Sequence, residues 1–309
     1  MIQEAVSEAH LRVERRPGWL RRETTPALIA ALVTVVLWAS AFVGIRSAGK
    51  TLSPGPLTLG RLFVGTAVLA LIAAARRELV PSREHVRSVA PALLGCGLLW
   101  FGAYNIALNA AERRVDAGTA AMLVNVGPIL IAILAGFALR EGFPRSLLLG
   151  CAIAFAGVVV IGLATSTGGS TSTGVVLCVL AACAYAGGVV LQKLVLGRLS
   201  ALQTTFLCCL VAALACLPFA PQLGRELGRA DAGSIGWILY LGAFPTAIAF
   251  TTWAFALART TAGKLAATTY LVPPISVLLG WLLLGESPPA LAFLGGAVAL
   301  AGVAVVRRG

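Results

Sequence analysis

Ten long apolar runs follow one another along this chain of 309 residues, and they constrain its fold more than any other feature. They cover about residues 26–45, 56–75, 89–111, 117–139, 146–164, 175–193, 201–220, 232–257, 262–284 and 289–306. An α-helix rises about 1.5 Å per residue, so each run can cross the ~30 Å hydrocarbon core of a bilayer. No run alternates apolar and polar residues as the strands of a membrane barrel do. The sequence therefore predicts an all-α membrane protein with ten transmembrane helices.

The composition excludes a water-soluble fold. The chain is 59% hydrophobic and 12% charged, whereas soluble domains carry about 25% charged residues. A net charge of +12 would indicate a nucleic-acid partner in a soluble chain. Here the basic residues lie between apolar runs without interleaved aromatic residues. We expect a lipid bilayer and a small-molecule substrate as partners, and no nucleic acid.

The basic residues are unequally divided between the two sides of the membrane. If residues 1–25 form a cytoplasmic tail, 17 of the 24 Lys and Arg residues lie on the inner side. The others are Arg61, within a run, and six residues on the outer side, namely Arg46, Lys50, Arg113, Arg114, Arg225 and Arg229. Basic residues are enriched on the cytoplasmic side, so we expect both termini to be cytoplasmic. The first run has the basic leader of a signal peptide but is long for one, so we expect it to be retained.

An internal repeat divides the chain into two halves. A shift of 145 residues aligns 117–160 with 262–305 without a gap, and 16 of the 44 positions are identical. We expect a first five-helix repeat over 26–164, a linker over 165–174 and a second repeat over 175–306. Because five is odd, the two repeats enter the membrane in opposite senses. Such inverted repeats are typical of alternating-access transporters, whose substrate site lies near the midplane.

Three motifs resemble those of a known family. Residues 270–286 read YLVPPISVLLGWLLLGE, residues 125–141 hold a weaker copy of this pattern, and residues 38–42 read WASAF. They are similar to signatures of the EamA-like drug/metabolite transporter superfamily, although Ala41 stands where that family often has a polar residue. The resemblance covers about residues 26–306. It implies an exporter of small metabolites, often amino acids, in the inner (plasma) membrane.

Acidic and histidine side chains are confined to the tail, the loops and the helix ends, with Glu112, Glu141 and Glu286 among them. A coupled transporter usually carries its proton on a carboxylate or histidine at mid-depth. We therefore expect transport without a buried proton-carrying carboxylate, by a facilitator, an exchanger or a carrier driven by the membrane potential. The seven cysteines lie inside apolar runs without metal-ligand spacing. We expect no catalytic residue, no metal and no cofactor.

The candidate substrate site is polar, aromatic and mostly uncharged. Asn125 and Tyr270 are equivalent in the repeat, each three residues before a matched proline. Pro128 and Pro273 free the carbonyl one turn earlier, so they either form gating kinks at a cavity or leave these side chains to bond neighbouring helices. We expect a cavity whose polar and aromatic residues suit an amino acid. The expected substrate-binding residues are Trp38, Ser40, Trp100, Tyr104, Asn105, Asn109, Asn125, Tyr185 and Tyr270.

Arg61 is the one charged residue that stands inside a run away from its ends. Its long side chain either snorkels to the outer surface or lines the exit path, where it would attract a carboxylate. Spans five and ten instead carry small residues on one helical face, including Gly150, Gly157, Gly295 and Gly302. Such faces allow close helix packing, either within one chain or across a homodimer.

The preferred hypothesis is an exporter of amino acids, with aromatic or other hydrophobic ones favoured. A multidrug or organic-cation exporter of the same fold is the alternative. A mid-membrane acid or an aromatic cage would normally bind the cation, and the sequence offers only the aromatic half. A membrane scaffold without transport is another alternative. An intramembrane enzyme would need ionisable groups at mid-depth, which the runs lack apart from Arg61.

Overall fold

Helices build the described chain, which comprises residues 24–78, 81–115, 120, 123–166, 171–284 and 289–308 of a computed structural model. Those of the first half are α2 (Thr24–Ala48), α3 (Pro54–Ala75), α4 (Arg83–Cys96), η2 (Gly97–Tyr104), α5 (Asn105–Ala111), α7 (Gly127–Ala138) and α8 (Arg145–Thr165). Those of the second half are α9 (Ser172–Val195), α10 (Ala201–Ala215), η3 (Leu217–Phe219), α11 (Ala220–Leu227), α12 (Ala232–Leu241), η4 (Gly242–Ile248), α13 (Ala249–Leu257), α14 (Ala262–Thr268), η5 (Thr269–Leu271), α15 (Val272–Leu284) and α16 (Ala290–Arg308). The described residues contain no strand, and residues 1–23 of the predicted tail and Glu286 lie outside them, while residues 24 and 25 already belong to α2.

Eight helical stretches within the described residues are long and apolar enough to cross a membrane, and a ninth is formed if α10 and α11 count as one bent span. The sequence predicts ten. The bend of 51° between α10 and α11 follows from Pro218 and Pro221, which cannot donate to the hydrogen-bond ladder of α10. The remaining difference lies in the fourth run, where the described helix is α7 with 12 residues.

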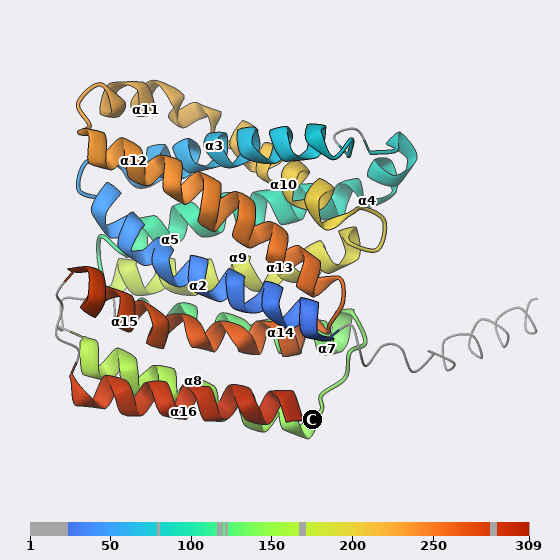
Figure 1. Cartoon of the computed structure of the whole chain (residues 1–309), viewed down its shortest axis with the longest axis vertical. Coiled ribbons are helices and arrows are strands. Elements are labelled where there is room, and N and C mark those ends of the chain that lie inside the picture. The colour runs from blue at the N-terminus through green and yellow to red at the C-terminus, as the bar shows by residue number, and fades with distance from the viewer. Residues whose placement is uncertain are drawn as a thin grey trace, which may run out of the picture.

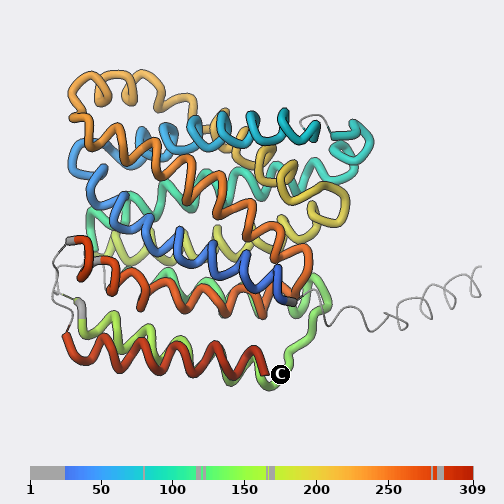
Figure 2. The backbone as a smooth tube through the Cα atoms, in the orientation of Figure 1, coloured from blue at the N-terminus to red at the C-terminus, as the bar shows by residue number. Residues whose placement is uncertain are grey.

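The helices lie side by side in one bundle (Figure 1). α8 and α16 form a pair at one edge of the bundle, and α3 and α11 lie at the opposite edge. The tube in Figure 2 shows that α2 begins and α16 ends at the same end of the bundle. The first helix of each half packs against the other half, since α2 contacts α12, α13 and α15 while α9 contacts α4, η2, α5 and α7. The two halves are therefore interlocked around a shared centre.

Two π-helical segments, η2 and η4, widen the third and eighth predicted spans. They begin at Gly97 and Gly242, which are 145 residues apart. A Cβ atom at Gly97 would lie 2.9 Å from the carbonyl oxygen of Cys208, and one at Gly242 would lie 2.8 Å from that of Arg61. Glycine is needed at both positions because the second helix of the other half approaches so closely. Single π turns interrupt the regular ladder, often at functional sites.

The small-residue faces of α8 and α16 pack on each other within one chain. Gly157 lies against Gly295 and Ala299, and Gly302 lies against Gly150 and Ala154, so the two helices run antiparallel. A Cβ atom at Gly157 would lie 2.5 Å from the backbone nitrogen of Ala299. Close van der Waals contact between backbones is the main source of helix association in lipid. These glycines thus join the last helices of the two halves.

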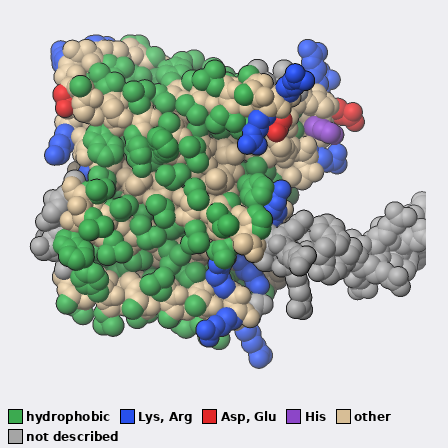
Figure 3. Space-filling model, in the orientation of Figure 1, with side chains coloured by type: hydrophobic (Ala, Val, Ile, Leu, Met, Phe, Trp, Pro, Cys, Tyr) green, Lys and Arg blue, Asp and Glu red, His purple; other side chains and the backbone are tan. Residues whose placement is uncertain are grey.

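The surface is apolar around its middle. Figure 3 shows hydrophobic side chains covering one face of the bundle, with Lys and Arg gathered towards its two ends. Large apolar side chains are exposed there, among them Leu71, Phe137 and Leu282 at more than 70% of their area. Such a surface suits hydrocarbon, since a soluble protein rarely exposes apolar patches of this extent.

Candidate substrate site

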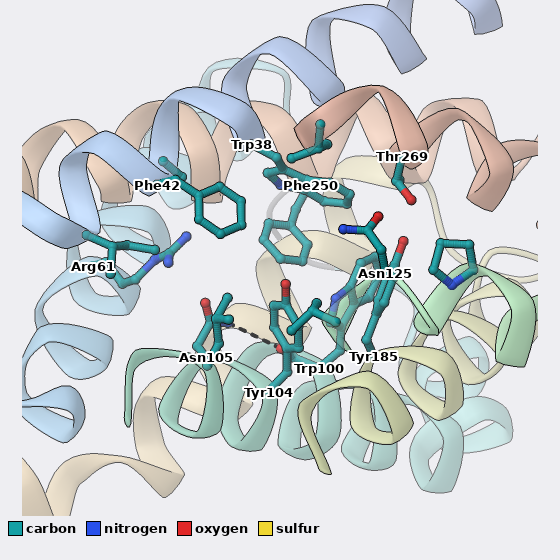
Figure 4. A pocket seen from close by; sticks show the side chains of 16 residues that line it. Trp38, Phe42, Arg61, Trp100, Tyr104, Asn105, Asn125, Tyr185, Phe250 and Thr269 are labelled. Carbon is teal, nitrogen blue, oxygen red and sulfur yellow. Dashed lines mark hydrogen bonds between the residues drawn. The ribbon is translucent and has the colours of Figure 1, made fainter. Parts of the chain in front are cut away.

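A cavity lies in the centre of the bundle, where α2, α3, η2, α5, α9, α13 and η5 meet (Figure 4). Its open volume is about 80 Å³, and one water needs about 10–15 Å³ of such volume. The cavity therefore has room for several waters or for part of a small solute. Its lining residues are Trp38, Ala41, Phe42, Ile45, Arg61, Trp100, Tyr104, Asn105, Leu108, Val124, Asn125, Pro128, Tyr185, Phe250, Thr269 and Val272.

Aromatic rings form one wall of the cavity. The ring centroids of Trp38 and Phe250 are 5.3 Å apart, and those of Trp100 and Phe250 are 4.9 Å apart, both edge to face. Tyr185 extends this wall, with its centroid 5.4 Å from that of Trp100. Edge-to-face pairs at these distances are favourable and hold the rings in place. The wall is thus a rigid apolar surface contributed by both halves.

Arg61 supplies a positive charge opposite this wall. Its side chain is only 4% exposed, and its Nε donates to the hydroxyl oxygen of Thr246 at 3.0 Å. Figure 4 shows its guanidinium directed into the cavity. Of the two sequence-based readings, the structure thus shows Arg61 lining the cavity and not at the surface. Among the described lining residues there is no Asp or Glu, so an anionic group of a solute would complement this buried charge.

Neutral polar groups add directed hydrogen bonding. Asn105 uses its Nδ2 to donate to the carbonyls of Phe101 at 2.9 Å and Trp100 at 3.2 Å, which the widened turn of η2 leaves available. The hydroxyl of Tyr185 is buried close to Thr269 but makes no hydrogen bond of regular geometry with a described residue. A buried polar atom without a partner is costly. A polar group of a solute would remove that cost.

The structure brings most of the residues singled out from sequence to this cavity and places four elsewhere. Those that line it are Trp38, Arg61, Trp100, Tyr104, Asn105, Asn125, Pro128 and Tyr185. Those outside its lining are Ser40, Asn109, Tyr270 and Pro273. Ser40 shares a hydrogen bond of 2.6 Å with the hydroxyl of Tyr240.

Tyr270 differs from its repeat equivalent Asn125 because of the local backbone. It lies in η5, a 3₁₀ turn that ends two residues before Pro273. A 3₁₀ turn has about three residues per turn instead of 3.6, which changes the side-chain directions around the axis. Thr269 therefore lines the cavity, while Tyr270 is fully buried with its ring centroid 6.5 Å from that of Phe155.

Sequence reasoning missed several lining residues. Phe42 lies one turn after Trp38, and Phe250 is the repeat equivalent of Asn105. Helical spacing and the repeat were therefore signals for both. Ile45, Leu108 and Val272 carry no such signal, because apolar residues in a transmembrane run look the same whether they face lipid, protein or a cavity.

Two further acidic residues show how the halves are joined and where charge is buried. The carboxylate of Glu141 accepts hydrogen bonds from the backbone nitrogens of Ala262 at 2.8 Å and Gly263 at 3.2 Å, so it caps α14 of the other half. Glu112 follows α5 at a helix end, but both of its carboxylate oxygens are buried. The sequence places Glu112 at a helix end, as observed, but does not predict that its carboxylate oxygens are buried there.

The comparison with known families decides what kind of protein carries this site. The model of the EamA-like transporter family matches residues 25–163 and again residues 172–308. The chain belongs to the EamA-like transporter family. The two matches correspond to the two halves described above. This EamA-like transporter is thus a multi-pass membrane transporter and not an enzyme.

Relatives of this EamA-like transporter cover nearly its whole length. A "probable terminal-alkyne amino-acid exporter" of Streptantibioticus cattleyicolor is 34% identical over 91% of this chain and 93% of its own length. An uncharacterized transporter of Bacillus subtilis is 30% identical over 92% of each chain. A solved crystal structure matches with a TM-score of 0.74 at 20% identity, over 91% of this chain and 98% of that chain. At this identity the structure supports the fold alone.

Proposed function

We propose that this EamA-like transporter exports amino acids, with aromatic or other hydrophobic ones favoured. The observation that carries the proposal is the buried guanidinium of Arg61 facing an aromatic wall in one cavity. An amino acid offers a carboxylate to the first and an apolar side chain to the second. A relative of 34% identity named as a probable amino-acid exporter supports the same substrate class.

The proposed mechanism is alternating access between two inverted five-helix repeats in the inner (plasma) membrane, with ten spans and both termini cytoplasmic. Two separate family matches, one in each half, support the repeat. So do the π segments that begin 145 residues apart and the antiparallel contact of α8 with α16, in which Gly157 and Gly302 are equivalent. The 17 basic residues assigned to the inner side support the orientation.

Each half contributes part of the binding site, which is the arrangement that rocking of the halves requires. Arg61 lies on α3 and is held by Thr246 on η4, so a movement of the halves would reorient the guanidinium. Pro128 lies at the start of α7, directly after a non-helical turn at 125–126. We propose that this break and its counterpart at η5 and Pro273 act as hinges.

The energy source we propose is the substrate gradient, an exchanged solute or the membrane potential, since the described lining of the central cavity holds no carboxylate to carry a proton.

A homodimer, if it forms through α8 and α16, would use their outer faces. The small-residue faces already pack on each other. Apolar side chains such as Leu149 and Leu294 are exposed on those outer faces.

Export of an organic cation is the second candidate, favoured by the aromatic wall. Cations bind well over aromatic faces, but here they would meet the charge of Arg61 in a medium of low dielectric constant, where like charges repel strongly. We therefore prefer a substrate that carries a carboxylate.

Uptake into proteoliposomes tests the proposal. A panel of labelled aromatic and aliphatic L-amino acids is offered with and without an imposed pH gradient. The expected result is saturable uptake of a hydrophobic subset that does not depend on the gradient. Saturable uptake of organic cations with no amino-acid uptake would overturn the proposal, and gradient-driven uptake would overturn its energy source.

A further inference from the structure

A second cavity lies beyond the central one, at the C-terminal end of α2. It has an open volume of about 180 Å³ and is lined by Arg46, Lys50, Asn109, Glu112 and Arg113, among others. Ile45 lines both cavities, so the two are adjacent. In the proposed orientation this second cavity opens on the outer side, and we call it the outer cavity.

Three acceptor oxygens in the outer cavity lack hydrogen-bond partners among the described residues. Asn109 is 3% exposed, and its Nδ2 donates to the hydroxyl of Thr58 at 3.0 Å. Its Oδ1 is buried without a hydrogen-bond partner among the described residues, and so are both carboxylate oxygens of Glu112. Leaving an acceptor unsatisfied costs stability, and a charged one costs more. A donor group with several N–H bonds would satisfy these oxygens together.

The same cavity is surrounded by positive charge. Arg46, Lys50 and Arg113 line it, and Arg61 is near enough to Glu112 to act on its charge. A simple cation would be attracted by Glu112 but repelled by these four basic groups. A simple anion would be attracted by the four basic groups but repelled by Glu112. A zwitterion with an ammonium and a carboxylate a few ångströms apart can place its ammonium at Glu112 and its carboxylate at the basic side chains.

The polar stripe of one helix connects the two cavities. Asn105 lines the central cavity, while Asn109, one turn later, and Glu112, about one more turn later, line the outer cavity. Residues spaced by three or four positions lie on one helical face. A solute that moves outwards along this face would exchange one set of polar contacts for the next.

We propose that the outer cavity is a second binding site for the ammonium and carboxylate groups of the transported amino acid. Glu112 and the Oδ1 of Asn109 accept hydrogen bonds from the ammonium, and the cationic lining residues meet the carboxylate. This inference rests on the proposed function, which it deepens by adding a site that recognises the zwitterion as such. In contrast, the central cavity recognises the carboxylate and the side chain.

Equilibrium dialysis of the purified full-length protein with labelled L-phenylalanine and L-leucine tests this. Glu112→Gln keeps the size of the side chain and removes its charge, and Arg61→Gln removes the charge in the central cavity with a shorter polar side chain. The wild type should bind two molecules per chain, each single variant one, and the double variant none, because losing one partner of a buried charged contact weakens binding by about tenfold or more. Glu84→Gln, which removes an exposed carboxylate in the first turn of α4, should leave both sites intact.

The substrate analogue 3-phenylpropionate, which lacks the ammonium, separates recognition of the ammonium from a general effect on the fold. In the wild type it should occupy only the central site, so Glu112→Gln should not weaken its binding there while Arg61→Gln abolishes it. A loss of 3-phenylpropionate binding in Glu112→Gln would overturn the inference, as would two bound L-phenylalanine molecules in that variant.

The outcomes also separate this inference from the proposed function. One bound amino acid that depends on Arg61 but not on Glu112 would overturn the outer site and leave the proposed function standing. No binding of either amino acid by the wild type would overturn both. If Glu112→Gln does not fold, the same experiment uses a double variant, Lys50→Gln with Arg113→Gln. Both residues are exposed, so their replacement should not disturb the fold. That pair should weaken the outer site for L-phenylalanine about tenfold, and an unchanged affinity would contradict the proposal.

Discussion

The Nε of Arg61 donates to the hydroxyl oxygen of Thr246 at 3.0 Å, and this bond connects α3 in the first half to η4 in the second. Thr246 donates in turn to the carbonyl oxygen of Leu241 at 2.8 Å, in the widened π turn. The bond uses one edge of the guanidinium and leaves the other for the cavity. The π turn thus positions the charge that we assign to substrate binding.

Thr246→Val should weaken substrate binding without removing the charge. Valine keeps the shape of threonine but cannot accept from Nε, and a hydrogen bond to a charged group contributes about 1.5–3 kcal/mol. We expect the KM for L-phenylalanine uptake to rise about tenfold or more. The control is Thr251→Val, whose hydroxyl donates to the carbonyl of Ala247 in its own helix. An equal KM in the two variants would contradict the positioning role of Thr246.

Glu141→Ala should lower thermal stability. The carboxylate caps α14 through the backbone nitrogens of Ala262 and Gly263, and removal of an N-cap typically costs about 0.5–2 kcal/mol. The Tm in detergent should therefore fall, while Glu141→Gln, which keeps one acceptor oxygen, should lie between. Glu84→Ala, at an exposed position, serves as the control. A Glu141→Ala protein as stable as this control would show that the cap does not hold the two halves together.

Gly157→Ala should destabilise the contact between α8 and α16. The new Cβ would lie 2.5 Å from the backbone nitrogen of Ala299, and backbone atoms cannot give way as a flexible side chain can. Overpacking of this kind costs about 1–3 kcal/mol. Gly236→Ala is the matched control, because nothing lies within 4 Å of its added Cβ. It should be neutral or slightly stabilising, and a similar loss of Tm in both variants would contradict the described packing.

Binding at the outer cavity should depend on pH through Glu112. This residue lies just beyond the stretch Arg83–Ala111, and burial raises its pKa to about 7 although Arg46 and Arg61 act to lower it. The other charged or titratable described residues near it are Lys50, Tyr104, Arg113 and Cys178.

The sign of this dependence follows from the charge that the ammonium needs. The carboxylate of Glu112 is ionised above its pKa, so the affinity of the outer site for L-phenylalanine should be highest above about pH 8 and fall about tenfold per pH unit well below 7. Dialysis from about pH 5.5 to about pH 8.5 measures it. Glu112→Gln removes the titrating group and should show no such fall. A wild-type affinity that is flat over this range would refute the role of the ionised carboxylate.

The apolar runs predicted the helices well because span length is set by the bilayer. α3 at 54–75 and α8 at 145–165 agree closely with runs at 56–75 and 146–164. The π segments were not predicted, because their widened turns depend on contacts such as that of Gly97 with Cys208, which lies far away in the chain. The bend after α10 was missed because Pro218 stands inside the run 201–220, which is otherwise long enough to span, and Pro221 comes directly after it.

The site was predictable where its residues differ from lipid-facing ones. Asn105, Tyr185 and Arg61 stand out because an amide, a hydroxyl or a charge is expensive in hydrocarbon and must face the interior. The direction of Tyr270 could not be read from the repeat, because the 3₁₀ turn changes the register locally. The burial of the Glu112 carboxylate could not be predicted, because the position of a residue along a helix does not show whether neighbouring helices cover its side chain.

The most direct test of the account compares Arg61→Gln with Arg229→Gln in proteoliposome uptake of labelled L-phenylalanine. Arg61 is the buried cation of the central cavity, whereas Arg229 is exposed and follows α11. Loss of a buried charged contact should lower saturable uptake at low substrate concentration about tenfold or more in Arg61→Gln, with Arg229→Gln close to the wild type. Saturable uptake by Arg61→Gln that equals the wild type would contradict the claim that this cavity binds the carboxylate of an amino acid.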